Sequence, residues 1–208
     1  MPGVADTRSR FGDLFPVYEW LMIAVAAIVF GLVVLAIIRY RRRSDVAPRG
    51  KDKRPLAESL YALVLAAIAV MLVTLTFRTE DKIDPVARKG GVRLNVLAFQ
   101  WQWRFRYPDF DKTVIGTAHH EPTLVVPVQT LIRVDGTSRD VIHSFWIPEQ
   151  RFKRDEFPKR HTQFDLRFDR VGTYIGRCAE FCGLHHVDMG FFVKAVPRAE
   201  FRRWLESG

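Results

Sequence analysis

Hydrophobic and polar positions follow two different patterns along this chain. Two long runs without a charged residue come first, Leu21 to Ile38 with 18 residues and Ser59 to Phe77 with 19. As helices rising about 1.5 Å per residue, the runs extend roughly 27 and 28 Å, close to the thickness of the hydrocarbon core of a bilayer. Neither run has the polar face that a helix of a soluble protein needs. The pattern therefore predicts two transmembrane helices, over residues 17–38 and 56–78.

The segment between these runs, residues 39–55, is strongly basic, with eight Lys and Arg against two Asp. Short basic loops stay in the cytoplasm, so residues 1–16 and 79–208 are expected on the outer side. A cleaved signal peptide, the alternative for the first run, would need a basic start, whereas Asp13 and Glu19 precede it. We therefore expect a multi-pass protein of a bacterial plasma membrane with both termini outside.

After residue 79 the chain takes on the period of β-strands. Residues 92–107 alternate strongly, and shorter β-rich runs follow, separated by Pro, Gly and Asp. These runs are residues 123–126, 131–135, 141–147, 162–168, 172–177 and 190–196. Pro197 followed by RAEFRRWLE predicts a short amphipathic closing helix. The expected fold class is a two-helix transmembrane hairpin followed by an all-β barrel or sandwich over residues 79–208.

Composition and charge narrow the classes of function. Twelve per cent aromatic residues and only 11 Pro exclude intrinsic disorder, and two Cys exclude a disulfide-dense scaffold. A net charge of +9 would suit a nucleic acid, but much of the excess lies in the basic loop, so no nucleic-acid partner is expected. From residue 78 onward, 22 Lys and Arg against 17 Asp and Glu leave a formal charge of +5.

Candidate metal ligands gather in one short segment near the C-terminus. They are Cys178, Cys182, His185, His186 and Met189. A further histidine, His143, lies on an upstream β-rich run. Thiolate and thioether ligands select copper or zinc, and two thiolates can bridge two copper ions that each take one imidazole and one weak ligand. A disulfide between Cys178 and Cys182 would not explain why two histidines and a methionine accompany the cysteines. A structural zinc site with two Cys and two His would not explain the methionine.

The same residues resemble a known family. The pattern C-x-E-x-C-x3-H-x2-M over residues 178–189, the upstream DVIHSFW, the aromatic FQWQWRF and the two apolar runs resemble subunit II of cytochrome c oxidase, in order from about residue 17 to residue 206. The resemblance implies a cupredoxin β-barrel with two copper ions. It implies as ligands His143, Cys178, Cys182, His186, Met189 and the backbone carbonyl of Glu180. His185 falls where the family has no ligand.

Three further roles are implied by position within that family. Trp101 corresponds to the tryptophan that receives electrons, the Glu180 side chain to one that reaches a magnesium ion shared with subunit I, and Glu58 to a glutamate at the mouth of a proton channel. Each residue also has a plainer interpretation. Trp101 would belong to an aromatic core stripe over residues 99–107, Glu180 would be a surface carboxylate, and Glu58 would favour the helix dipole.

The resemblance implies the subunit through which electrons enter a respiratory oxidase, an oxidoreductase and translocase. Cytochrome c would be the donor, and subunits I and III would be partners, oxygen being reduced in subunit I with proton pumping. Asp140 is the candidate docking residue. Because Arg106 and Arg139 stand where some relatives have acids, we expect a donor that is acidic or membrane-tethered.

Three alternatives compete with this interpretation. A quinol-oxidising relative would lack the copper ligands, and the copper domain of nitrous oxide reductase is not expected behind a helical hairpin. A membrane-anchored copper carrier without an electron-transfer role is the main alternative, because ligands alone do not exclude it. His119, His120 and His161 receive no role.

Overall fold

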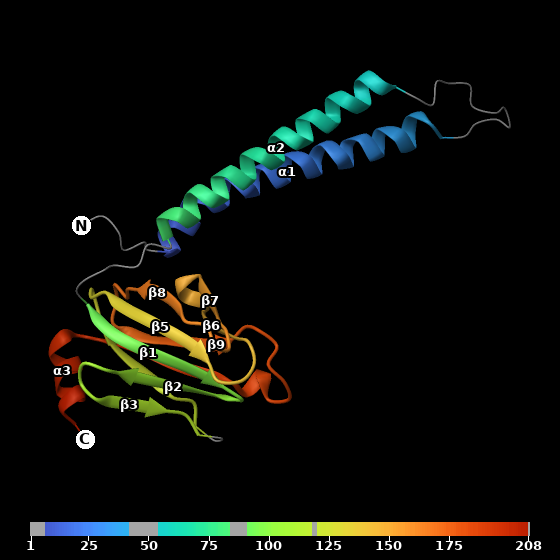
Figure 1. Ribbon diagram of the computed structural model, residues 1–208. Helices are drawn as coiled ribbons and strands as arrows, with labels where there is room; N and C mark the ends of the chain where they lie inside the picture. The colour runs from blue at the N-terminus through green and yellow to red at the C-terminus, as the bar shows by residue number, and fades with distance from the viewer. Residues whose placement is uncertain (1–6, 42–53, 84–90, 118–119, 208) are drawn as a thin grey trace. The chain divides into compact units, whose positions relative to one another are not determined.

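The computed structural model describes residues 7–41, 54–83, 91–117 and 120–207 (Figure 1). Most of the predicted basic loop lies outside these residues, as do the first six residues, residues 84–90 and His119. The chain divides into a helical unit, Phe11–Glu80, and a unit that contains the β domain.

Two long helices account for the two apolar runs. Helix α1 spans Thr7–Arg39 and helix α2 spans Pro55–Ile83. Helix α1 begins ten residues before the predicted span 17–38. The thickness of the bilayer sets the length of the apolar run, but the helix can continue beyond it into polar surroundings. The Tyr18 hydroxyl donates to the carbonyl of Leu72 at 3.1 Å, which joins the two helices. Both helices are long and apolar enough to cross a membrane.

The β domain consists of two five-stranded sheets, in the orders β3-β2-β1-β5-β8 and β4-β10-β9-β6-β7. The strands are β1 Val92–Phe99, β2 Gln102–Tyr107, β3 Lys112–Ile115, β4 Thr123–Pro127, β5 Ile132–Ser138, β6 His143–Ile147, β7 Phe152–Glu156, β8 Thr162–Leu166, β9 Gly172–Cys178 and β10 Gly190–Val196. The pairs β1–β5 and β4–β10 are parallel, and the other pairs are antiparallel. The predicted class, an apolar helical pair followed by an all-β sandwich, is confirmed.

The alternating stretch 92–107 is two strands and not one. Strands β1 and β2 form a hairpin in which Phe99 pairs with Gln102, so Gln100 and Trp101 lie in the turn. Alternation restarts after the turn and buries Trp103 and Phe105. Trp101 therefore lies in a turn and not on a strand of the alternative aromatic stripe over residues 99–107, although it still packs against the core. Strands β3 and β7 escaped prediction, because both lie at sheet edges and bury few side chains.

Aromatic side chains fill the space between the sheets. Phe145 stacks on Phe191 with ring centroids 4.6 Å apart, and Trp103 meets Phe191 edge-on at 5.3 Å. All three are fully buried, and burial of each stabilises the fold by about 2–3 kcal/mol. Helix α3, Arg198–Glu206, closes the domain as predicted and buries Phe201. The core formed in this way supports the strand ends that carry the candidate ligands.

Candidate metal centre

Strand pairing explains how candidate ligands far apart in the sequence meet. His143 begins β6 and Cys178 ends β9, and these two strands pair with Phe145 opposite Cys178. The Cys178 amide donates to the Met189 carbonyl at 3.0 Å, which closes the metal-binding loop, residues 178–189, between β9 and β10. The ends of the loop are therefore fixed by the sheet that carries His143.

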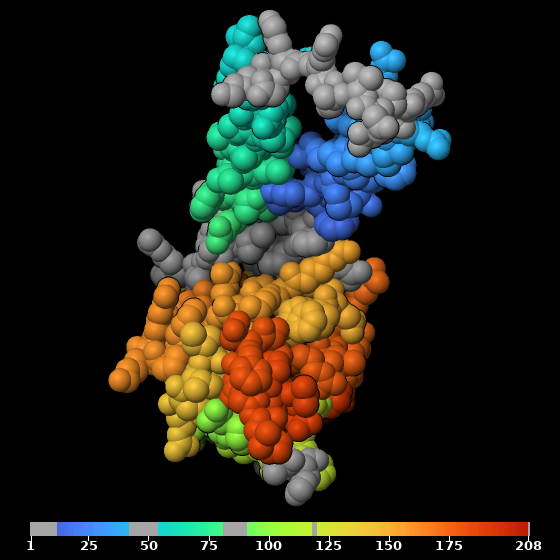
Figure 2. All heavy atoms as spheres, turned by 90° about the vertical axis from the view of Figure 1, so that its right-hand side faces the viewer, coloured from blue at the N-terminus to red at the C-terminus, as the bar shows by residue number. Residues whose placement is uncertain are grey.

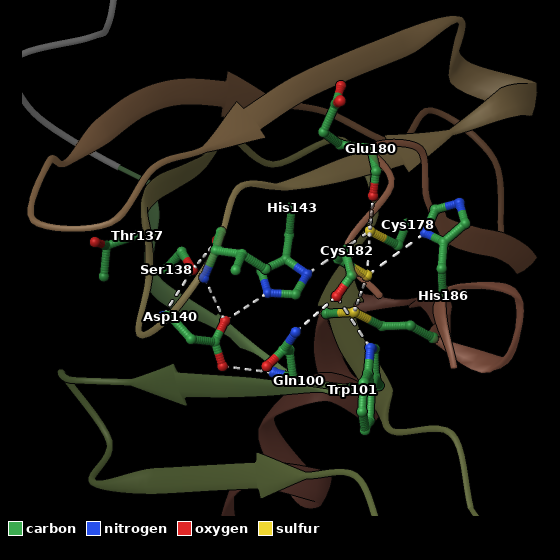
Figure 3. A network of polar contacts seen from close by, with 12 residues as sticks. Gln100, Trp101, Thr137, Ser138, Asp140, His143, Cys178, Glu180, Cys182 and His186 are labelled. Carbon is green, nitrogen blue, oxygen red and sulfur yellow. Dashed lines mark hydrogen bonds and ion pairs between the residues drawn. The ribbon is translucent and has the colours of Figure 1, made fainter. Parts of the chain in front are cut away.

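All the predicted ligand atoms converge on the two thiols (Figure 3). The Cys178 sulfur lies 3.9 Å from Nδ1 of His143 and 3.4 Å from the Glu180 carbonyl oxygen. The Cys182 sulfur lies 3.5 Å from Nδ1 of His186 and 3.8 Å from the Met189 sulfur. Each thiol thus has one imidazole and one weak donor beside it.

The two thiols are free, and their sulfur atoms lie 3.8 Å apart. A disulfide would need about 2.05 Å, so this arrangement is not a disulfide. The donor atoms of His143, Cys178 and Cys182 all lie within 4.8 Å of one another, and this group could hold a metal ion. Sulfur and imidazole donors fit copper or zinc and do not fit magnesium or calcium, which prefer oxygen.

The two thiols differ in their electrostatic surroundings. Burial alone would raise the pKa of Cys178, but the hydrogen bond to His143 and contacts with the backbone of Ser144 and Glu180 lower this pKa to about 7. For Cys182, burial and the neighbouring Cys178 raise the pKa to about 12. Cys178 therefore ionises first, and a bound cation would be needed to make both groups thiolates at neutral pH.

Asp140 holds His143 in position. One carboxylate oxygen lies 2.8 Å from Nε2 of His143, and the other accepts the backbone N–H of Gln100, also at 2.8 Å. These bonds keep the pKa of Asp140 low, although its partial burial opposes them. With Nε2 engaged, the Nδ1 atom of His143 is directed toward Cys178, the arrangement in which a carboxylate orients a metal-ligating histidine.

The turn between β1 and β2 lies against the metal-binding loop. The Trp101 indole N–H donates to the Cys182 carbonyl at 3.1 Å, and the Gln100 side-chain amide donates to the same oxygen at 2.8 Å. Gly183 has a φ of +117°, and a Cβ there would lie 3.2 Å from the Gln100 amide nitrogen. Glycine is therefore needed at this position for both its conformation and the close approach.

Comparison with known proteins identifies the family. The family model for the periplasmic domain of cytochrome c oxidase subunit II matches residues 92–196. The chain belongs to the cytochrome c oxidase subunit II family. A probable cytochrome c oxidase subunit 2 of Streptomyces avermitilis is 32% identical over 226 residues, covering 89% of this chain and 70% of the relative.

Two solved structures of this family resemble the β domain. One is the periplasmic domain of subunit II of cytochrome oxidase from Bradyrhizobium japonicum, with a TM-score of 0.53 and 30% identity over 57% of this chain and 94% of that one. The other is a mixed disulfide intermediate between a thioredoxin-like protein and subunit II of cytochrome c oxidase. Its TM-score is 0.51 at 29% identity, over 58% of this chain and 92% of that one. The β domain is therefore cupredoxin-like.

The other residues noted in the sequence lie away from the two thiols. The Glu180 carboxylate points away from the thiols and lies 3.8 Å from Lys153 (Figure 3). His185 packs edge-on against Trp101, with ring centroids 4.8 Å apart, and does not join the thiols. Glu58 belongs to the helical unit, where its carboxylate accepts the backbone N–H of Arg54 at 3.0 Å at the start of α2. His161 pairs with Asp135.

Two features beside this family site were missed by sequence reasoning. The contact of Gln100 with the metal-binding loop could not be found, because residues 92–107 looked like one strand. Glu156 is fully buried on β7, opposite His143, and a Cβ on Gly136 would lie 2.2 Å from its carboxylate oxygens. Its burial raises the pKa of Glu156 to about 9. The burial of Glu156 could not be predicted, because a charged residue in a segment not recognised as a strand is expected to be exposed.

Proposed function

We propose that this chain is the subunit through which electrons enter cytochrome c oxidase, and that it accepts them from cytochrome c at a dinuclear copper centre. The observation that carries the proposal is the convergence of four donor atoms on two free thiols, with the Trp101 N–H bonded to the Cys182 carbonyl. Two copper ions bridged by both thiolates would use every donor in this group.

The residues that would hold copper are His143 and His186 as imidazoles, Cys178 and Cys182 as bridges, and Met189 with the Glu180 carbonyl as weak ligands. A copper pair bound there would supply one-electron storage. The chain itself contributes a fixed cage: Asp140 orients His143, and the buried Met189 and aromatic core exclude water. Little rearrangement is then needed when the charge of the centre changes.

We propose Trp101 as the residue through which the electron reaches this cage. Its indole is half-buried, and the hydrogen bond to the Cys182 carbonyl gives a short covalent and hydrogen-bonded connection to a thiol-bearing residue. Subunits I and III are the proposed partners in the membrane, and oxygen reduction with proton pumping would occur in subunit I. The Glu180 side chain is proposed to reach magnesium at that border, and Glu58 to collect protons.

A second partner is suggested by the similar structure of a mixed disulfide with a thioredoxin-like protein. Cys178 and Cys182 must both be thiols to bind metal, so an oxidised pair would have to be reduced before loading. We propose a thioredoxin-like reductant for this chain, acting before copper binds. Family membership does not favour the alternative of a copper carrier without an electron-transfer role.

Metal analysis and electron paramagnetic resonance of the purified full chain test the proposal. We expect two copper ions that share one unpaired electron, and a violet protein. Cys182→Ser should abolish the shared signal, because a single thiolate bridge cannot hold the pair. Met189→Leu should keep both ions while making them unequal, because the thioether is a weak ligand. Stoichiometric zinc without copper uptake would contradict the proposal.

A further inference from the structure

The ligand side chains of the candidate metal centre are almost closed to solvent. Those of His143, Cys178, Cys182 and Met189 are buried, and each residue is at most 7% exposed. Of the five ligand side chains, His186 is the one that is half-buried. The metal-binding loop itself lies on the surface of the β domain that faces the viewer in Figure 2, in orange-red. The least covered approach to the ligands is therefore beside His186.

Two side chains of the loop adjoin His186 at this approach, and they differ in chemistry. Phe181 packs edge-on against the His186 ring, with centroids 5.9 Å apart, and offers no donor atom to a metal. His185 directly precedes His186, so their Cα atoms lie about 3.8 Å apart. The His185 side chain is 55% exposed. An exposed imidazole therefore stands one residue away from a half-buried ligand.

The His185 imidazole is oriented as a metal ligand would be. Its Nδ1 atom lies 3.3 Å from a carboxylate oxygen of Asp188. A carboxylate only accepts hydrogen bonds, so Nδ1 donates, and in the neutral imidazole the lone pair is then on Nε2. Among the described residues, Nε2 of His185 has no hydrogen-bond partner. The pair Asp140–His143 has the same form, a carboxylate that fixes one ring nitrogen and leaves the other for a metal.

A groove makes His185 accessible to a source of copper. The groove has a volume of about 850 Å³, and His185 and Asp188 are among its lining residues. His185 packs edge-on against Trp101, with ring centroids 4.8 Å apart, which holds the imidazole at the wall of the groove. The Glu180 carboxylate is another surface donor of the loop, but it lies 3.8 Å from Lys153, which offsets its charge. His185 is thus the better placed group to meet an incoming metal ion.

We propose that His185 is the entry ligand for copper, the first group that binds each ion, and that it passes the ion to His186 and Cys182. This inference rests on the proposed function. The transfer is an exchange of ligands, in which a cuprous ion leaves the His185 imidazole for an imidazole and a thiolate of the cage. The thiol protons that copper displaces leave to water, and no electron is exchanged. His185 is then free to receive the next ion.

The test measures copper uptake by the purified full chain, reduced and free of metal, in the absence of oxygen. The probe is cuprous copper held by a coloured chelator, whose absorbance gives the rate at which copper leaves it. His185→Asn removes the entry imidazole, and His185→Met replaces it with a thioether, which also binds cuprous copper. His161→Asn is the matched control, because His161 is an exposed histidine paired with Asp135 and does not line the groove. Final copper content is measured for each variant.

We expect His185→Asn to slow uptake about tenfold and to reach the same final copper content as the parent. His185→Met should load at a rate close to that of the parent, because a ligand is present again although the ring contact with Trp101 is lost. His161→Asn should load as the parent does.

Equal rates for His185→Asn and the parent, or an equal slowing by His161→Asn, would overturn the inference. Slow uptake by His185→Met would also overturn it, because His185 would then have a structural role alone. A lower final copper content in His185→Asn would make this residue a ligand of the finished centre and not an entry ligand. A parent that takes up no copper would instead contradict the proposed function.

Discussion

Replacing Glu156 with glutamine should remove a pH dependence from the stability of the β domain. The Glu156 side chain is fully buried, and neither carboxylate oxygen has a hydrogen-bond partner among the described residues. Burial, with a smaller contribution from Asp135, raises the pKa of this group to about 9 from an ordinary value of 4.5, while Arg154 opposes the shift and Asp155 adds to it. Glu156 is therefore protonated in the folded domain at neutral pH.

The magnitude follows from the difference between the folded and unfolded pKa values. Between about pH 4.5 and pH 9 the unfolded chain releases a proton that folded Glu156 keeps. The free energy of unfolding therefore falls by about 1.4 kcal/mol per pH unit through this group as the pH rises. At pH 7 the loss relative to pH 4.5 is about 3 kcal/mol. Glutamine is neutral at every pH and has a similar shape, so the variant escapes this loss.

Urea unfolding of the metal-free β domain between pH 5 and pH 8 measures the effect. The stability of Glu156→Gln minus that of the parent should rise by about 4 kcal/mol over this range, while other titrating groups cancel. Glu149→Gln, at an exposed position, is the matched control and should give a flat difference. If the Glu156→Gln difference is also flat, the carboxyl is ionised or hydrated in the folded domain, and the reasoning fails.

Three further predictions concern the candidate metal centre, the helical unit and the topology of the chain. Asp140→Asn should lower copper affinity about tenfold or more and alter the resonance signal, because His143 loses the carboxylate that orients it; competition with a copper chelator measures the affinity. Glu58→Gln should slow turnover of the assembled oxidase without changing the rate of electron transfer into copper, because the amide cannot collect protons. If neither turnover nor electron transfer changes, Glu58 only caps helix α2. A protease added to right-side-out vesicles should cleave after residue 79 and spare residues 39–55, since eight basic residues hold this loop inside; cleavage of the loop from outside would reverse the topology.

The helical pair and most strands could be predicted because each depends on local pattern. Eighteen or more uncharged apolar residues have few other stable environments than a bilayer. Runs such as 172–177 and 190–196 became β9 and β10 because their buried positions recur within one short strand. The ligand set followed from residue chemistry and family resemblance, and the structure brings all of its members together.

The parts that could not be predicted depend on contacts between distant segments. Alternation through residues 99–107 gave no sign that the chain reverses at Gln100 and Trp101, because a hairpin turn can preserve the period. The bond from His143 to Asp140 depends on side-chain geometry, so no sequence pattern pointed to it; the docking role of Asp140 stays a prediction. Glu156 fits over Gly136 of the opposite sheet, a complementarity that no local pattern records.

The place of the metal-binding loop has a consequence for the order of assembly. The loop joins the last two strands, and β10 completes its sheet by pairing in parallel with β4, far earlier in the chain. The loop itself is closed by the local pairing of β9 with β10, whereas the pairing of β10 with β4 joins distant segments and is of the kind that forms slowly. We therefore expect the two thiols to meet before the sheet that buries them is complete. Thiols that are still exposed are open to oxidation, so reduction of the pair should matter most in the newly made chain.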